Sequence, residues 1–144
     1  MASATRARLD RLLADTGFLI AAGQRGDPLH ENAKSFLQNY SGRLVTVSAV
    51  IVETCFFFGS AGKLKLLEWV RSGGLAVAEI PVSAYPELAA IIEKYADHDL
   101  DFTDAALVWL AGESGLRRIL TVDRADFSAF RIKGGKRFEL IDWM

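Results

Sequence analysis

Four carboxylic acids occupy positions in this sequence from which they could act together on one reaction. Asp15, Asp104 and Asp123 each follow a short apolar segment or begin a helical one. Glu53 lies in the helical segment that follows a second apolar strand. In a parallel sheet the carboxyl ends of the strands share one edge, and ligands bind there. We therefore expect these four side chains to meet at that edge.

A cluster of carboxylates without a matching base is unfavourable, because like charges raise one another's pKa values. A divalent cation removes this repulsion, and ligand sets made only of oxygen suit Mg²⁺ or Mn²⁺ better than zinc. Glu53 adds weight to this interpretation. An acid within the apolar segment 50–58 is costly to bury unless it is paired, exposed or bound to a metal.

Each acid also has a purely structural alternative. Asp15 could cap the helix that follows it, and Asp123 could cap the turn after a strand. Asp101 and Asp104 stand three residues apart, which is the spacing of a helix cap and its third residue. Glu53 could lie on an exposed helix edge. Only the joint placement of the acids favours a metal site.

Other catalytic patterns in the chain are incomplete. The segment 97–101 carries acids with the spacing of a calcium loop, but glycine and glutamate are missing from the later positions that such a loop needs. His30 and His98 lie in polar surroundings, and Cys55 lies among apolar residues, so no Ser–His–Asp or Cys–His set is evident. Asp126 is more typical of a turn than of a metal ligand.

The chain has 144 residues, of which 51% are hydrophobic and 24% charged. These values are typical of one globular domain, which we expect to cover residues 1–144, with residues 1–8 as a frayed start. A net charge of −1 excludes nucleic-acid binding through bulk positive charge but not through a local patch. Four cations near the C-terminus could form a basic rim or simply a solvated hairpin: Arg131, Lys133, Lys136 and Arg137.

Short apolar strands alternate with helical segments along the chain. We expect strands at 12–15, 44–47, 75–80, 118–122 and 138–141. We expect helices at 18–22, from 27 or 28 to about 40, and at 48–58, 64–70, 85–95 and 102–113, with a turn at 123–127. This alternation predicts an α/β domain with a largely parallel sheet. No apolar run is long enough to span a membrane, and the single cysteine excludes a disulfide framework, so we expect a cytoplasmic protein.

Four blocks of sequence, in this order along the chain, resemble the PIN domain family. They are Leu-Ala-Asp15-Thr-Gly-Phe-Leu-Ile-Ala, Ser-Ala-Val-Ile-Val-Glu53, Asp101-Phe-Thr-Asp104-Ala-Ala-Leu-Val and Leu-Thr-Val-Asp123-Arg-Ala-Asp-Phe. The resemblance extends from about Leu12 to Ile141. More narrowly, the chain is similar to the VapC-type ribonuclease toxins of bacterial toxin–antitoxin pairs.

The resemblance implies a three-layer α/β/α domain and an endoribonuclease that depends on Mg²⁺ or Mn²⁺. Asp15, Glu53, Asp104 and Asp123 match the catalytic acids of the family, and Asp101 matches an auxiliary acid. Asp15 and Asp104 would hold the main metal, Glu53 would align water, and Asp123 would support a second ion or the water ligands. Two hydroxyl residues stand where the family often supports its site: Thr16 and Thr121.

The resemblance also implies partners. Members of this kind are usually homodimers, and a cognate antitoxin inhibits them by laying an apolar helix across the surface. The side chains that could form such a groove are those of 56–58, Leu64, Leu67 and Trp69, unless they belong to the core. Arg124 and Arg25 are candidates for binding the RNA phosphates. Two alternatives remain: an RNA-processing nuclease without an antitoxin, and a non-catalytic binding module with the same fold.

Overall fold

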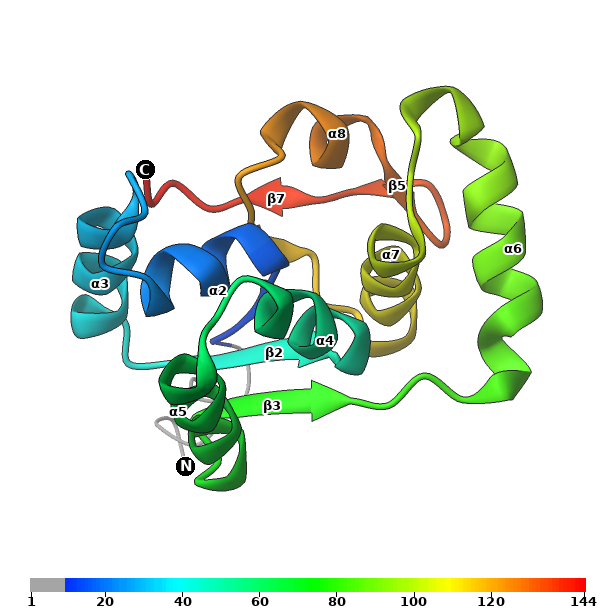
Figure 1. Cartoon of the computed structure of the whole chain (residues 1–144). Coiled ribbons are helices and arrows are strands. Elements are labelled where there is room, and N and C mark those ends of the chain that lie inside the picture. The colour runs from blue at the N-terminus through cyan, green and yellow to red at the C-terminus, as the bar shows by residue number, and fades with distance from the viewer. Residues whose placement is uncertain (1–9) are drawn as a thin grey trace, which may run out of the picture.

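A parallel sheet of five short strands organises the computed structural model, which describes residues 10–144 (Figure 1). The strand order is β3-β2-β1-β4-β7, and every pairing within this sheet is parallel. The strands are β1 (Arg11–Ala14), β2 (Arg43–Val47), β3 (Leu75–Ala78), β4 (Arg118–Leu120) and β7 (Glu139–Leu140). The expected α/β class and parallel sheet are thus confirmed.

Helices flank the sheet and complete a three-layer α/β/α arrangement (Figure 1). They are α2 (Thr16–Gly23), α3 (His30–Asn39), α4 (Ser48–Phe56), α5 (Ser60–Arg71), α6 (Tyr85–Lys94), α7 (Phe102–Ser114) and α8 (Arg124–Ala129). A separate antiparallel hairpin joins β5 (Arg131–Ile132) to β6 (Lys136–Arg137). None of the helices that the structure describes has the length and apolar character needed to cross a membrane.

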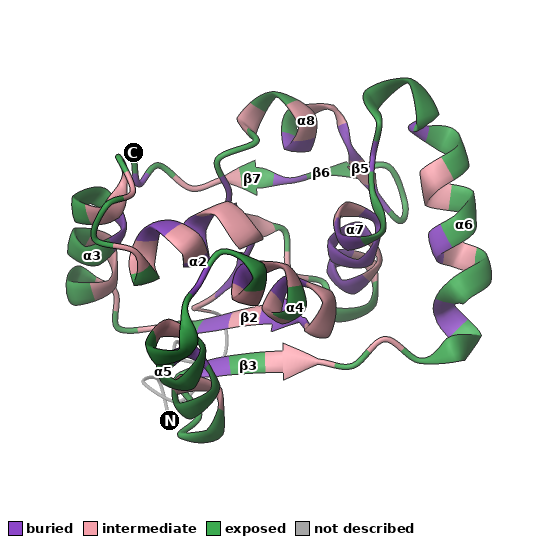
Figure 2. Ribbon diagram, viewed as in Figure 1, coloured by how far each residue is buried: buried purple, intermediate pink, exposed green. Residues whose placement is uncertain are grey.

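The central strand β1 is buried on both faces, and this explains its uninterrupted apolar sequence. Leu12, Leu13 and Ala14 are each 0% exposed, and they belong to the main hydrophobic core. Figure 2 shows this core as buried residues on the strands and on the helix sides that face them. Because β1 pairs with both β2 and β4, the residue that follows it lies in the middle of the sheet edge.

Helix α7 is the most deeply packed helix of the fold, with seven buried residues between Thr103 and Ala111. Asp101 and Asp104 form a capping box at its first turn, and Gly115 ends it in the left-handed conformation at φ 77°. Since the helix is anchored in the core, its first turn is held at a fixed place beside the sheet edge.

Several boundaries differ from the expected ones. Helix α5 begins at Ser60 rather than at 64, because the Lys63 N–H donates to the Gly59 carbonyl at 3.0 Å and so adds a turn before the apolar stripe. Helix α3 begins at His30, since the Asp27 carboxylate accepts the Leu29 N–H at 2.8 Å and so stabilises a turn before the helix. Helix α4 begins at Ser48 as expected, but it ends at Phe56 rather than at 58.

The C-terminal third departs most from the expectation. The predicted turn at 123–127 was wrong, because buried Phe127 and Phe130 hold this segment as helix α8. The strands of the 131–137 hairpin were not predicted, although a hairpin was one of the two interpretations of its cations. The expected fraying of residues 1–8 lies outside the described residues.

Truncation of a leucine in this sheet should destabilise the chain far more than truncation of one on its surface. Leu120 in β4 is 0% exposed, whereas Leu64 in α5 is 68% exposed. We expect Leu120→Ala to lower the free energy of unfolding by about 3 kcal/mol, and Leu64→Ala to change it by less than about 0.5 kcal/mol. Urea unfolding of the matched variants measures both, and equal losses would contradict this core assignment.

Candidate active site

Asp15 lies at the end of β1, where it is only 4% exposed and begins helix α2. One carboxylate oxygen, Oδ1, accepts the Thr16 N–H at 2.7 Å and so caps the helix. The other, Oδ2, accepts the Thr121 hydroxyl at 2.8 Å. The capping alternative is therefore part of the observed structure, but capping leaves the second oxygen directed at the neighbouring strand.

Thr121 follows β4 and connects this strand to two other parts of the site. Its hydroxyl oxygen accepts the Asp123 N–H at 3.0 Å, while its carbonyl accepts the indole N–H of Trp143 at 3.3 Å. Trp143 is 6% exposed and packs edge-on against Phe18 in α2, with ring centroids 4.9 Å apart. Trp143 thus packs between helix α2, which follows Asp15, and the segment after β4 that carries Asp123.

Glu53 reaches the same edge from α4. Its Oε2 accepts the Thr16 hydroxyl at 3.3 Å, and the side chain is half-buried. This resolves the cost of an acid in an apolar helix, because the carboxylate is both hydrogen-bonded and partly hydrated. The two predicted supporting threonines therefore bind two of the four predicted acids, Thr16 to Glu53 and Thr121 to Asp15.

Asp101 and Asp104 meet at the start of α7. The Asp101 Oδ1 accepts the Asp104 N–H at 2.8 Å, and the Asp104 Oδ2 lies 3.4 Å from the Asp101 nitrogen. The structural alternative for this pair is thus observed as well. Asp104 is half-buried and close enough to Asp15 for the two charges to repel each other.

Burial and mutual repulsion raise the pKa values of three of these acids. Burial raises the pKa of Asp15 to about 6 despite its hydrogen bonds from two threonines, and the charges of Asp123 and Glu53 add to the rise. Burial, and then the charges of Asp101 and Asp15, raise the pKa of Asp104 to about 8.

Asp123 behaves in the same way at the exposed side of the site. Burial, followed by the charges of Asp126 and Asp101, raises its pKa above the usual range. Asp126 also lies 3.8 Å from the His98 ring nitrogen. Asp126 therefore lies in the first turn of α8 rather than in the expected turn, between a surface histidine and Asp123.

The donor chemistry of this cluster fits a hard divalent cation, because every group is a carboxylate and their charges oppose one another. Within residues 10–144, however, no three acidic, histidine or cysteine side chains already stand close enough to hold a metal ion. Asp15 is held by its two hydrogen bonds, whereas Glu53, Asp104 and Asp123 are partly or fully exposed. An ion bound beside Asp15 would therefore need some of these three side chains to move toward it.

The two predicted phosphate-binding arginines lie in different places. Arg124 is next to Asp123, and its guanidinium donates to the Ile141 carbonyl at 3.2 Å, so it stays at the sheet edge. Arg25 follows the far end of α2, about 12 Å along the helix from Asp15. Its side chain lines a separate groove, and the structure does not bring it to the acids.

That groove runs between α2, α3 and α5 and has a volume of about 460 Å³. Its apolar lining includes Leu19, Leu37, Leu66 and Trp69, while Arg25, Lys34 and Lys65 also line it. Of the aromatic run at 56–58, Phe58 lines the groove and is buried, whereas Phe56 and Phe57 are 81% and 58% exposed. Leu64 and Leu67 are also exposed. The core interpretation of these residues therefore holds for Phe58 and in part for Trp69, which is half-buried and packs against the core.

Trp143 is the site residue that the sequence reasoning missed. It lies 22 positions from Thr121, and the last strand gives no local pattern that would connect the two. A buried tryptophan does need a partner for its N–H group. The position of that partner depends on the sheet order, so sequence spacing does not reveal it.

A sequence model of the PIN domain family matches residues 12–133. Ribonuclease VapC26 of Mycobacterium tuberculosis is 31% identical over 134 residues, which cover 90% of this chain and 99% of that protein. The crystal structure of Mycobacterium tuberculosis VapC20, a toxin that cleaves the sarcin–ricin loop, superposes with a TM-score of 0.69 at 18% identity. The match covers 75% of this chain and 86% of that one.

A toxin–antitoxin complex from Klebsiella pneumoniae superposes with a TM-score of 0.63, also at 18% identity. Here the match covers 92% of this chain and 98% of that chain. At this level of identity, the two solved structures show that the fold is shared.

Removal of one repelling charge should stabilise the protein when no metal is present. Because the folded pKa values of Asp15 and Asp104 are raised, the native state binds more protons than the unfolded chain, and stability falls as pH rises from about 4 to 8. We expect Asp104→Asn to melt about 4 °C above wild type at pH 8 in EDTA, and close to wild type at pH 4.

Thermal melts across this pH range measure the effect. Asp142→Asn is the control, because Asp142 is exposed and is not among the charges that raise the pKa of Asp15, Asp104 or Asp123. Mutual repulsion of the acids is contradicted if Asp104→Asn melts at or below wild type at pH 8, or if Asp142→Asn gains as much stability.

Proposed function

This chain belongs to the PIN domain family, and on that premise we propose that it is a metal-dependent endoribonuclease and the toxin of a toxin–antitoxin pair. The observation that carries the proposal is the buried carboxylate of Asp15, with three further acids around it at the sheet edge. The similar Mycobacterium tuberculosis protein named as a ribonuclease matches this chain over nearly its full length. We propose that residues 1–144 act as one nuclease domain.

Asp15, Asp104 and Asp123 are the residues that would hold Mg²⁺ or Mn²⁺, with Asp101 beside them. When bound, such an ion lowers the pKa of a water ligand and stabilises negative charge that develops on a phosphodiester. An ion there also balances the charges whose repulsion raises the pKa values of these acids.

Neighbouring side chains orient the acids and affect whether they are ionised. The Thr121 hydroxyl favours the ionised form of Asp15 and aims its Oδ2. The Thr16 hydroxyl holds Glu53 at the same edge, where its partly hydrated carboxylate can orient the attacking water and accept its proton. Arg124 keeps unused N–H donors for an RNA phosphate next to Asp123.

The antitoxin would bind in the groove between α2, α3 and α5. An amphipathic helix fits there, because the groove has an apolar lining with cations around it, and exposed Leu64 and Leu67 continue the apolar surface along α5. Arg25 and Lys34 would then pair with acidic residues of the antitoxin. One of the structures similar in fold is a toxin–antitoxin complex.

A homodimer would use a second apolar surface. Val82 is 78% exposed, and Tyr85 and Phe102 form an exposed edge-on ring pair with centroids 5.8 Å apart. Solvent exposure of such side chains on adjacent elements is typical of an interface. We propose that dimerisation covers them, and that the protein acts in the cytoplasm, where its RNA substrate is found.

The carboxylates should be essential for RNA cleavage. We expect Asp15→Asn and Asp104→Asn each to lower the rate of Mn²⁺-dependent cleavage of total RNA by about 100-fold or more, because each removes a metal ligand. Asp142→Asn should cleave at the wild-type rate. Circular dichroism of each variant shows whether it is folded.

The same variants test the biological role when they are expressed in a bacterial host. Wild type should arrest growth and produce discrete RNA fragments, while Asp15→Asn should do neither. Full activity of folded Asp15→Asn would refute the assigned site. Cleavage in vitro without growth arrest would refute the toxin role and leave an RNA-processing nuclease.

A further inference from the structure

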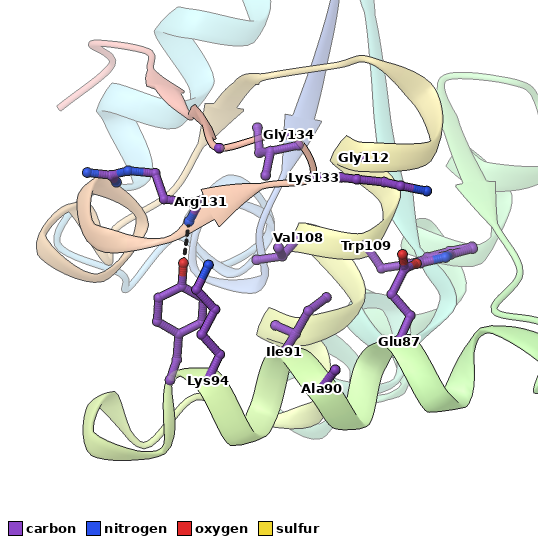
Figure 3. Close-up of a pocket in the computed structure, with 13 residues that line it drawn as sticks. Glu87, Ala90, Ile91, Lys94, Val108, Trp109, Gly112, Arg131, Lys133 and Gly134 are labelled. Atoms are coloured by element: carbon purple, nitrogen blue, oxygen red, sulfur yellow. Dashed lines mark hydrogen bonds between the residues drawn. The ribbon is translucent and has the colours of Figure 1, made fainter.

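A second cavity lies away from the acids, between α6, α7 and the β5–β6 hairpin, with a volume of about 250 Å³ (Figure 3). Ile91 of α6 and Val108 and Gly112 of α7 form its apolar floor. Lys94 lies at one end of the cavity, and Lys133 extends across α7 toward the other.

The hairpin is held against α7 and the end of α6 by specific contacts, so the cavity has a fixed wall. The Arg131 N–H donates to the Tyr95 hydroxyl at 2.7 Å. The Arg131 guanidinium points away from the cavity and donates to three carbonyls at the end of α8. Gly112 allows the close approach, because a Cβ there would lie 3.1 Å from the Cβ of Lys133.

The charge around this cavity favours an anion. Between Phe127 and Phe138 the chain carries four cations and no acid, although its net charge is −1. Lys94 and Lys133 are both exposed, and neither has an ion-pair partner within 4 Å among residues 10–144. Glu87 is the one acid in the lining. The two lysines are therefore available to a ligand with negative charge.

The shape and the remaining side chains narrow the ligand further. A cavity of about 250 Å³ lies just below the usual range of small-ligand pockets, roughly 300–1,000 Å³, so it suits one flat ring rather than a larger molecule. Half-buried Trp109 stands at the rim beside Glu87 (Figure 3). An indole face binds a nucleobase by stacking, and the Glu87 carboxylate can accept an exocyclic amine. A nucleobase with flanking phosphates can contact the indole, the Glu87 carboxylate and the two lysines together.

The position of the cavity on α7 connects it with the acids. Val108 and Gly112 lie one and two turns after Asp104, about 6 and 12 Å along the helix axis. An RNA strand whose scissile phosphate lies beside Asp104 can therefore reach the cavity with a nearby nucleotide. The same helix that places Asp104 would place this nucleotide.

We propose that this cavity binds an unpaired nucleotide of the RNA substrate next to the cleaved bond, its base over the apolar floor and its phosphates at Lys94 and Lys133. The proposal rests on the ribonuclease function proposed above. Part of the affinity for RNA would then come from the α6–α7–hairpin cavity and not from the metal-binding acids.

Binding of fluorescein-labelled oligo(A) and oligo(U) strands of about 12 nucleotides, in EDTA so that no cleavage occurs, tests the proposal. The test variant is Lys94→Gln/Lys133→Gln. The matched control is Lys136→Gln/Arg137→Gln. It also removes two charges, from the hairpin that carries Lys133, but at positions outside the cavity lining. We expect the test variant to raise Kd about tenfold and to lower the slope of log Kd against log salt by about 2, since two phosphate contacts are lost. The control should change Kd by less than about twofold.

Trp109→Phe supplies a second readout. RNA should quench the tryptophan fluorescence of wild type, and this variant should lose that part of the quenching while its fold is unchanged by circular dichroism. Equal losses in the test and control variants would refute the proposal, because they would show general charge attraction. Wild-type affinity in the test variant would refute it as well.

Three further outcomes separate the possible sources of failure. If free AMP competes as well as the labelled strand, the cavity is a mononucleotide site and the assignment to RNA is wrong. If wild type neither binds nor cleaves RNA, the proposed ribonuclease function fails together with this inference. If wild type cleaves RNA and the test variant binds it normally, only the cavity proposal fails.

Discussion

The burial of a single carboxylate, that of Asp15, is the constraint on which this site depends. An ionised acid that is 4% exposed needs hydrogen-bond donors or a cation, and the fold supplies two donors, the Thr16 N–H and the Thr121 hydroxyl. These are insufficient to keep the pKa of Asp15 at its usual value, because burial and neighbouring acids raise it to about 6. A bound cation would remove the remaining free-energy cost of keeping this carboxylate ionised.

The architecture around Asp15 serves to hold that arrangement. The pairing of β1 with β4 brings Thr121 to Asp15 across 106 positions of sequence, and the pairing of β1 with β2 sets α4 and Glu53 beside them. Gly17 permits the close approach of α2 to the segment after β4, since a Cβ there would overlap the side chain of Val122. Trp143 then fixes the carbonyl of Thr121. Elements from both ends of the chain thus determine the position of one carboxylate.

The sequence predicted the parts of this structure that have local signals. The apolar run before Asp15 indicated a buried strand, which the structure places at the centre of the sheet. The spacing of Asp101 and Asp104 indicated the helix start that is observed as a capping box. The helix expected at 18–22 already separates Arg25 from Asp15, but the groove that Arg25 lines depends on how α2 packs against α3 and α5, which has no local signal. The contacts of Trp143 and of the β5–β6 hairpin are tertiary, and no periodic pattern records them.

Calorimetric titration of Mn²⁺ into the folded protein at neutral pH tests the central claim most directly. Wild type should bind Mn²⁺, and Asp15→Asn should abolish binding. Thr121→Val should weaken it by about 10- to 100-fold, while Thr121→Ser, which keeps the hydroxyl, should bind nearly as wild type does. Mn²⁺ affinity that is unchanged in Asp15→Asn, or equal in Thr121→Val and Thr121→Ser, would contradict the view that this buried, threonine-held carboxylate organises the site.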